Sequence, residues 1–324
     1  MKVDSAMPTR LSKPLLSGPT GAPLCIASIG ECMVEMAPLQ TAGQFQQSFA
    51  GDTLNTLWYL RHLCPDWTCR YVSRVGRDKV SDDMLAMMAG AGIETGHIQR
   101  DPERTVGLYM ISLSEGERSF AYWRGQSAAK RLSEPPAQVA DAIADADVVF
   151  FSGITLAILE AHSRPAFLQS IDTARHAGKT VVFDPNLRPK LWQDVAQMRD
   201  AVMAGAGVSD MILPSSDEEA LHFGDANIVA TTERYLAAGA GSVVVKNASD
   251  TLHFVHNGHT GQATPRPAEV VVDTTSAGDS FNAGLLAGLS RHASINDAIA
   301  LGCDVARQVI GQKGALVALA PSDA

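Results

Sequence analysis

The sequence predicts an α/β fold in which a mostly parallel sheet is covered by helices on both faces. Short, almost uninterrupted apolar runs recur along the chain, for example at 148–151, 181–183 and 243–245. Such runs are typical of strands that are buried on both faces, and helix-length stretches separate most of them. With 324 residues and 46% hydrophobic composition, the chain can form one large domain or two small ones.

The predicted fold begins at 24–30, a short apolar segment with the character of a buried strand. Residues 1–23 are rich in Pro, Gly and Ser and lack the apolar core of a signal peptide. We expect them to be a disordered tail, or sequence upstream of the true start, followed by one domain over 24–320. The later elements expected from apolar runs and helical periodicity are strands at 148–151, 181–183, 211–213, 243–245 and 270–272, and helices at 164–177, 195–206 and 218–223.

Two segments interrupt the alternation of strand and helix. Residues 44–50 and 107–122 have the pattern of antiparallel strands, and a Ser-Glu-Gly-Glu turn at 114–117 divides the second segment into a hairpin. We therefore expect a small accessory sheet that stands off the main domain, with its segments at about 38–50 and 105–125.

Composition and motif content argue against several classes of protein. The formal charge is −9 and no basic patch with interleaved aromatic residues occurs, so nucleic acid is not an expected partner. No apolar run of roughly 18 residues occurs, so we expect no transmembrane helix. The five cysteines form no C-x-x-C pair, which suits a reducing cytoplasm. Walker-A spacing is absent, as is a G-x-G-x-x-G fingerprint after the first strand.

The stretch Asp-Thr-Thr-Ser-Ala-Gly-Asp at 273–279 is the most informative in the chain. A β-branched run precedes it and an apolar run follows, which predicts a strand, a tight turn and a helix. Small residues at 276–278 would let an anion approach the unpaired N–H groups of the helix N-terminus. Asp279 would stand beside that anion, either as a base for an attacking hydroxyl or only as a helix N-cap.

Further polar residues occupy positions where a ligand could bind. Asp52 and Asn55 can share one face at the start of a helix and suit a polyhydroxy ligand, or Asp52 can simply cap that helix. Tyr109 and Tyr122 lie on the predicted hairpin, where they can also pack on each other. Arg124, just after the hairpin, is a candidate to bind a ligand carboxylate bidentately.

Two more cations follow predicted parallel strands, at the sheet edge where open α/β folds bind ligands. Arg188 lies in the loop 184–189 between two prolines, which would hold it in place. Lys246 follows the strand at 243–245 and could reach a nucleotide phosphate. For both Arg188 and Lys246, an exposed place in a loop without any ligand is an alternative of equal weight.

Taken together, these segments resemble the ribokinase-like sugar kinases of the phosphofructokinase-B type. The stretch 273–279 is similar to the carboxy-terminal signature of that family, D-T-x-G-A-G-D, and the glycine at 51 with the amide at 55 is similar to its amino-terminal signature. The resemblance covers about residues 25–318. Some segments are most similar to the corresponding segments of family members that act on 2-keto-3-deoxygluconate. They lie at 29–35, 51–56, 107–109, 117–124, 156–159 and 184–192.

The resemblance implies a ribokinase-like three-layer α/β/α domain whose small sheet is a lid and often a dimer contact, hence a homo-oligomer. It also implies ATP-dependent phosphorylation of 2-keto-3-deoxygluconate at its terminal C6 hydroxyl, with Mg²⁺ held mainly through water. Asp279 would be the general base. The implied anion hole is Thr275, Ser276, Ala277 and Gly278, the sugar-acid pocket is Gly51, Asp52, Asn55, Tyr109, Tyr122, Arg124 and Arg188, and the nucleotide side is Lys246, Asn247, Ser249, Gly278 and Cys303.

Three departures from the family pattern carry expectations of their own. Ala50 replaces a common glycine near the lid, and Ser276 replaces the usual small residue of the anion hole. Ser216 stands where the family commonly has Asn, three residues before Glu219, which leaves Glu219 as an indirect metal residue. Another sugar kinase of the family, such as a fructokinase, a ribokinase or a 5-dehydro-2-deoxygluconokinase, is the alternative to this reading. A non-catalytic sugar-acid sensor is a second alternative.

Overall fold

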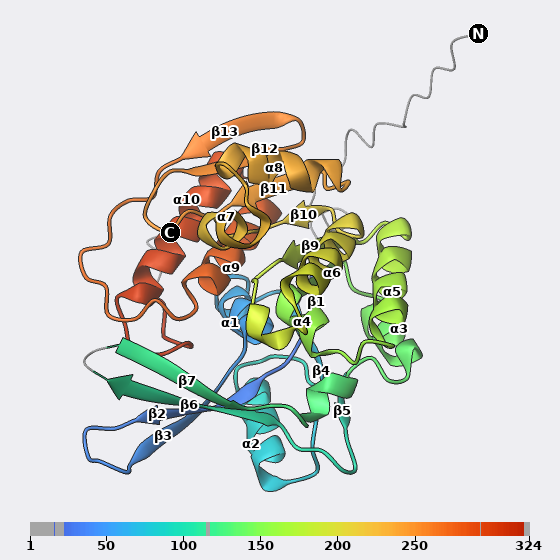
Figure 1. Cartoon of the computed structure of the whole chain (residues 1–324), viewed down its shortest axis with the longest axis vertical. Helices are drawn as coiled ribbons and strands as arrows, with labels where there is room; N and C mark the ends of the chain where they lie inside the picture. The colour runs from blue at the N-terminus through green and yellow to red at the C-terminus, as the bar shows by residue number, and fades with distance from the viewer. Residues whose placement is uncertain (1–15, 17–22, 115–116, 292, 321–324) are drawn as a thin grey trace.

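The main body of the protein has three layers, with one central sheet between two layers of helices (Figure 1). The structure is a computed structural model that describes residues 16, 23–114, 117–291 and 293–320. This arrangement confirms the predicted α/β class with a mostly parallel sheet. Most of the tail expected at 1–23, and the tip of the hairpin turn at 115–116, lie outside the described residues.

The main sheet has nine strands within the described residues, in the order β13-β12-β11-β10-β9-β8-β1-β4-β5. The strands from β11 to β5 pair in parallel, whereas β12 and β13 extend the sheet as an antiparallel hairpin. Their bounds are β1 (Cys25–Ile29), β4 (Thr68–Val75), β5 (Ile98–Arg100), β8 (Val148–Ser152), β9 (Thr180–Asp184), β10 (Met211–Ile212), β11 (Ser242–Val245), β12 (Leu252–His256) and β13 (His259–Ala263).

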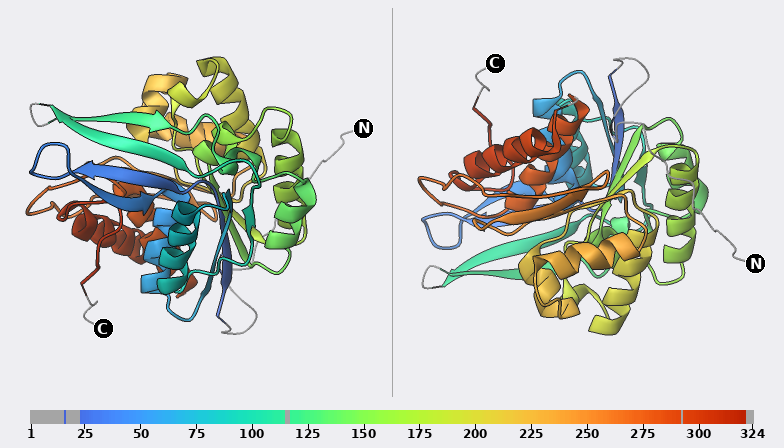
Figure 2. Two further views of the ribbon diagram at one scale, coloured as in Figure 1. Left: turned by 90° about the horizontal axis from the view of Figure 1, so that it is seen from below. Right: turned by 90° about the horizontal axis from the view of Figure 1, so that it is seen from above.

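Each face of the main sheet has its own layer of helices (Figure 2). One layer consists of α1 (Asp52–Leu63), α2 (Lys79–Gly90), α9 (Ala277–Ser290) and α10 (Ile295–Ile310). The opposite layer contains α3 (Pro136–Ile143), α4 (Gly153–Ile158), α5 (Arg164–His176), α6 (Val195–Gly207) and α8 (Ile228–Ala237). The short helix α7 (Ser216–Phe223) and two 3₁₀ turns, Ala128–Arg131 and Pro189–Leu191, complete the connections.

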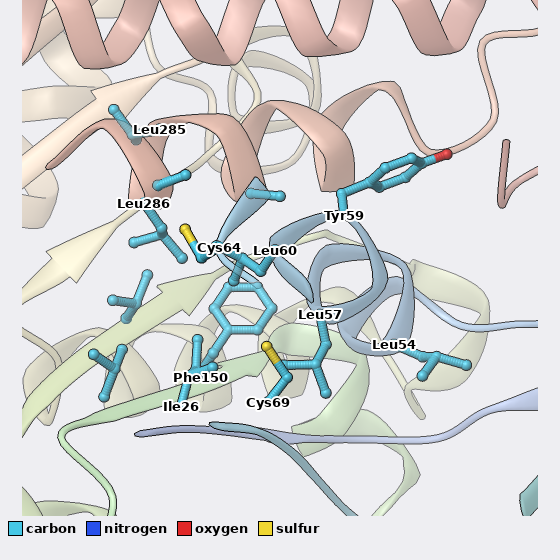
Figure 3. Packing of buried hydrophobic residues seen from close by; sticks show 14 of the residues in the cluster. Ile26, Leu54, Leu57, Tyr59, Leu60, Cys64, Cys69, Phe150, Leu285 and Leu286 are labelled. Atoms are coloured by element: carbon cyan, nitrogen blue, oxygen red, sulfur yellow. The ribbon is translucent and has the colours of Figure 1, made fainter. Parts of the chain in front are cut away.

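The core explains why the strands are almost continuously apolar. Successive residues of β1 point to opposite faces, so Ile26 packs into the cluster beneath α1 and α9 while Ala27 packs into the cluster beneath α4 to α6. Figure 3 shows Phe150 of β8 beneath Leu60 of α1, with Leu286 of α9 nearby. Burying one such large side chain is worth about 1.5–3 kcal/mol, so this packing fixes α9 firmly against the sheet.

A second, smaller sheet stands off the main body, as Figures 1 and 2 show. Its order is β3-β2-β6-β7, and its apolar inner face includes Met33, Tyr109 and Ile111, which pack with Ala315 near the end of the chain. The predicted accessory sheet is therefore confirmed, although one of its strands, β2, was not expected and pairs in parallel with β6. Its strands are β2 (Met33–Pro38), β3 (Phe45–Ala50), β6 (Gly107–Ser114) and β7 (Glu117–Trp123).

The strand predicted at 270–272 is wrong. The three valines form no strand, and their side chains are 61%, 60% and 50% exposed. A β-branched run forms a strand only where a neighbouring strand completes its hydrogen bonds, and among the described residues this run pairs with none; the N–H of Val272 instead donates to the carbonyl of Ile310. The opposite error concerns β4, a strand that the sequence analysis does not predict. Arg70 and Arg74 interrupt the apolar pattern of this strand.

In the described part of the chain, no helix combines the length and the apolar character needed to cross a bilayer.

Candidate active site

The turn 273–276 leads directly into α9 and leaves the start of that helix open. The carboxylate of Asp273 is buried and accepts hydrogen bonds from the backbone N–H groups of Thr275 at 3.0 Å and Gly314 at 2.9 Å. Helix α9 begins at Ala277, so the N–H groups of Gly278 and Asp279 have no carbonyl one helical turn earlier to bind. This geometry agrees with the anion site predicted here, and its role in binding phosphate stays a prediction.

Ser276 is the N-cap of α9 and has a left-handed backbone, with φ of +62°. A residue with a Cβ adopts this conformation at a cost of roughly 1–2 kcal/mol, which is why a glycine is the easier choice at this position. The serine hydroxyl gains a contact in return, because the amide of Asn55 donates to its Oγ at 2.7 Å. Serine in place of the usual small residue therefore adds a hydrogen bond between α1 and the turn before α9.

Asp279 lies in the first turn of α9, but it is not the N-cap, so the alternative of a simple cap does not hold. The Nδ2 group of Asn55 donates to Asp279 Oδ2 at 2.8 Å, and Thr56 Oγ1 donates to the backbone carbonyl of Asp279 at 3.2 Å. Burial, and secondarily the nearby carboxylate of Asp52, raises the pKa of Asp279 from 3.8 to about 7. A carboxylate with a pKa near neutrality can accept a proton and release it again.

A chain of hydrogen bonds connects the start of α1 to the end of β9. Asn186 donates from Nδ2 to Asp52 Oδ2 at 2.8 Å and from its backbone N–H to Asp184 Oδ1 at 3.1 Å. Asp184 Oδ2 also accepts from Lys246 Nζ at 2.8 Å and from Asn282 Nδ2 at 2.7 Å. Asp184, Lys246 and Asn282 are all buried, so this network is rigid and places an ammonium group beside the start of α9.

Both arginines expected to bind a ligand carboxylate already have a carboxylate partner. Arg124 donates from Nη2 to Oε2 of Glu31, whose side chain is fully buried. Arg188 donates from Nη1 to Glu218 Oε1 at 2.5 Å, and Glu218 Oε2 accepts the N–H of Leu187 at 2.9 Å. The positive charge of each arginine is thus compensated, so selectivity for an anion would have to come from the direction of the remaining N–H groups.

The two tyrosines lie together on the inner face of the small sheet. Their rings are 5.9 Å apart between centroids, so they do pack on each other. The Tyr109 hydroxyl donates to Glu35, whose other oxygen accepts from Ser48 at 2.9 Å, and Tyr109 is buried. Tyr122 is 53% exposed and is the tyrosine with surface free for a ligand.

The residues expected on the nucleotide side follow β11 or lie on α10. Asn247 accepts from Ser216 Oγ at 2.5 Å and donates to the carbonyl of Thr251 at 3.0 Å, which shapes the loop that carries the exposed Ser249. Cys303 is half-buried on α10, and burial raises its thiol pKa to about 11, which keeps it neutral. Their contact with a nucleotide stays a prediction.

The geometry around Glu219 does not fit an indirect metal role. Its side chain is 0% exposed, and its two oxygens accept from Arg234 Nη2 at 2.7 Å and from the Tyr235 hydroxyl at 2.8 Å. Sequence position alone suggested the metal role, whereas the burial of α7 against α8 directs this carboxylate into the protein.

The site also contains residues that the sequence reasoning passed over. Glu31 and Glu35 hold Arg124 and Tyr109, and both lie in the phrase 29–35 that carries part of the family resemblance. Asn282 follows Asp279 by three residues on α9, so the two side chains are neighbours on one face of the helix. The position of both acids within the phrase 29–35 was the signal in the sequence for the first two.

Comparison with known proteins agrees with this fold. The family model described as pfkB family carbohydrate kinase matches residues 25–322, and the chain belongs to that family. A 2-dehydro-3-deoxygluconokinase of Haemophilus influenzae is 37% identical over 90% of this chain and 95% of its own length. One from Dickeya dadantii is 36% identical over 91% and 97% respectively. Among solved structures, the PfkB protein from Polaromonas sp. JS666 superposes with a TM-score of 0.80 at 28% identity, covering 89% of this chain and 96% of its own.

Proposed function

We propose that this protein transfers a phosphoryl group from ATP to the C6 hydroxyl of 2-keto-3-deoxygluconate, also called 2-dehydro-3-deoxygluconate. The relatives from Haemophilus influenzae and Dickeya dadantii named for this activity cover almost the whole chain and support the reaction. The structural observation that carries the proposal is the carboxylate of Asp279, bound by Asn55 at the open start of α9.

In this proposal Asp279 accepts the proton of the C6 hydroxyl while the hydroxyl oxygen forms a bond to the γ-phosphorus and the bond to the ADP oxygen breaks. The N–H groups of Gly278 and Asp279, with the ammonium of Lys246 nearby, stabilise the negative charge on the transferring group. Asn55 orients the base, and Ser276 holds Asn55 in place.

The nucleotide is expected to arrive with Mg²⁺, which shields the phosphate charges when bound. Among the described residues no group of three or more His, Cys, Asp or Glu side chains forms a metal site. Mg²⁺ commonly binds through phosphate oxygens and water, and this is the mode of binding included in the proposal.

The sugar acid would bind between α1 and the small sheet. Asp52 and Asn186 offer an acceptor and a donor to sugar hydroxyls, and Arg124 with Arg188 offers N–H groups to the carboxylate. The small sheet would act as a lid that excludes water from the transfer step. A cytoplasmic location and assembly into a homo-oligomer complete the proposal.

The direct test is ADP release from Mg-ATP in the presence of 2-keto-3-deoxygluconate, its galactonate epimer, fructose or ribose. Preference for the keto acids, with ³¹P NMR placing the new phosphate on C6, would support the assignment. Turnover of a neutral sugar alone would leave the base and the fold in place and overturn the assigned substrate.

A further inference from the structure

The pair formed by Glu31 and Arg124 joins the small sheet to the main body. Glu31 lies in the connection from β1 to β2, and Arg124 follows the last residue of β7. Their side chains are 0% and 11% exposed, and Arg124 Nη2 donates to Glu31 Oε2. Neither charge could be buried alone without a large desolvation cost, so each group holds the other in place.

The hydrogen bonding of this pair is incomplete. Among the described residues, Glu31 Oε1 and Arg124 Nε are buried and have no hydrogen-bond partner. Unpaired polar atoms are rare in protein interiors, and each one calls for an explanation such as a ligand or a water molecule. One free donor and one free acceptor at a single point suit a ligand that carries both carboxylate oxygens and hydroxyl groups.

Two glycines make room for the pair. A Cβ on Gly51 would lie 2.1 Å from the backbone oxygen of Glu31, so the backbone of Glu31 lies directly against the residue that caps α1. A Cβ on Gly107 would lie 2.9 Å from Glu31 Oε1 and 3.1 Å from Arg124 Cβ. The pair is thus enclosed between the start of α1, where Asp52 and Asn55 lie, and the first residue of β6.

The charges explain why the orientation of Arg124 matters. Its positive charge is compensated by Glu31, so net charge at this point does not attract an acid. A ligand carboxylate must instead meet N–H groups that already point at it, and the bond from Nη2 to Glu31 fixes the plane of the guanidinium.

We propose that Glu31 is a positioning residue that orients Arg124 toward the carboxylate of the sugar acid and thereby sets the preference for acids over neutral sugars. This inference rests on the proposed function. Glu31 need not touch the reacting atoms, because it acts through Arg124.

The test compares three variants with a matched control. Glu31→Ala removes the partner of Arg124. Glu31→Gln keeps the size of the side chain and one hydrogen-bond acceptor. Gly107→Ala adds a methyl group that displaces the Glu31–Arg124 pair without changing the charge of either residue. The control is Asp101→Asn, because Asp101 is a similarly buried acid that follows β5 and pairs with Arg74 of β4, so it belongs to a different ion pair. For each protein, kcat and KM are measured for the keto acid, for fructose and for ATP, and folding is checked by circular dichroism.

We expect Glu31→Ala and Gly107→Ala to raise the KM for the keto acid about 10-fold or more, the factor that corresponds to one lost charge-assisted hydrogen bond. The KM for ATP should stay within about twofold, and the preference for keto acid over fructose should fall by the same factor as the keto-acid affinity. Glu31→Gln should remain within about threefold of the wild type, and the control should not differ from it.

An unchanged keto-acid KM in a folded Glu31→Ala protein would overturn the inference. So would an equal loss of affinity for ATP and sugar, which is the result expected of an ion pair that only holds the small sheet in place. Should Glu31→Ala fail to fold, Gly107→Ala decides by the same criteria. A wild-type protein without turnover of the keto acids would refute the proposed function itself, and this outcome is seen before any variant is compared.

Discussion

Replacing Asp279 with Asn tests the central chemical role in the site, because the substitution keeps the shape and removes the base. We expect kcat to fall by about 10²–10⁴, the usual contribution of a general base. The structure also predicts the pH dependence of the wild type. Since burial raises the pKa of Asp279 to about 7, the deprotonated base is scarce below that pH, and kcat/KM should rise with pH to a plateau above it.

The same carboxylate should influence stability, and the sign can be worked out. The pKa of Asp279 is about 7 in the folded protein and near its ordinary value of 3.8 in the unfolded chain, so ionisation penalises the folded state. The penalty is absent below about pH 4, grows as the pH rises toward 7 and is constant above that. Because the Asp279 side chain is partly exposed, solvent screens this penalty. We expect it to lower the free energy of unfolding by about 1–3 kcal/mol above pH 7.

Two measurements therefore check the reasoning together. Asp279→Asn should lose the pH-dependent rise in kcat/KM, measured by coupled ADP release between pH 5 and 9. The same protein should unfold at a higher temperature than the wild type at pH 8 but not at pH 4. Near-normal turnover of this variant, or a wild-type rate that does not change between pH 5 and 8, would refute the assigned role.

Four further substitutions follow from the contacts around the site. Asn55→Ala removes a donor that lowers the pKa of Asp279, so the pH–rate profile of this variant should have its inflection at a higher pH than that of the wild type. Arg124→Ala should raise the KM for the sugar acid and leave the KM for ATP unchanged; equal weakening of both ligands would contradict a carboxylate contact. Ser276→Gly relieves a left-handed backbone but loses the bond from Asn55, so the free energy of unfolding should change by less than about 1 kcal/mol in chemical denaturation. Glu219→Gln should lower the free energy of unfolding by about 1–3 kcal/mol, because Arg234 loses a buried partner, while the Mg²⁺ dependence of the rate stays as in the wild type.

The sequence by itself was sufficient for the class of fold and for selecting Asp279 as the proposed base. Strands buried on both faces are apolar at every position, so runs such as 148–151 can be recognised as strands from the local sequence alone. Asp279 was also recognisable, because a small-residue turn before a helix has a local signature that does not depend on distant residues.

The tertiary structure decided everything that depends on which groups meet. Val270 and its two neighbours have the propensity of a strand, but no neighbouring strand in the described chain pairs with them. Glu219 has the spacing of a metal residue, but the packing of α7 on α8 directs it to Arg234. Arg124 and Glu31 are 93 positions apart, and only the return of β7 to the start of β2 brings them together. Spacing along a chain predicts local geometry, whereas the partner of a charged side chain is fixed by the fold as a whole.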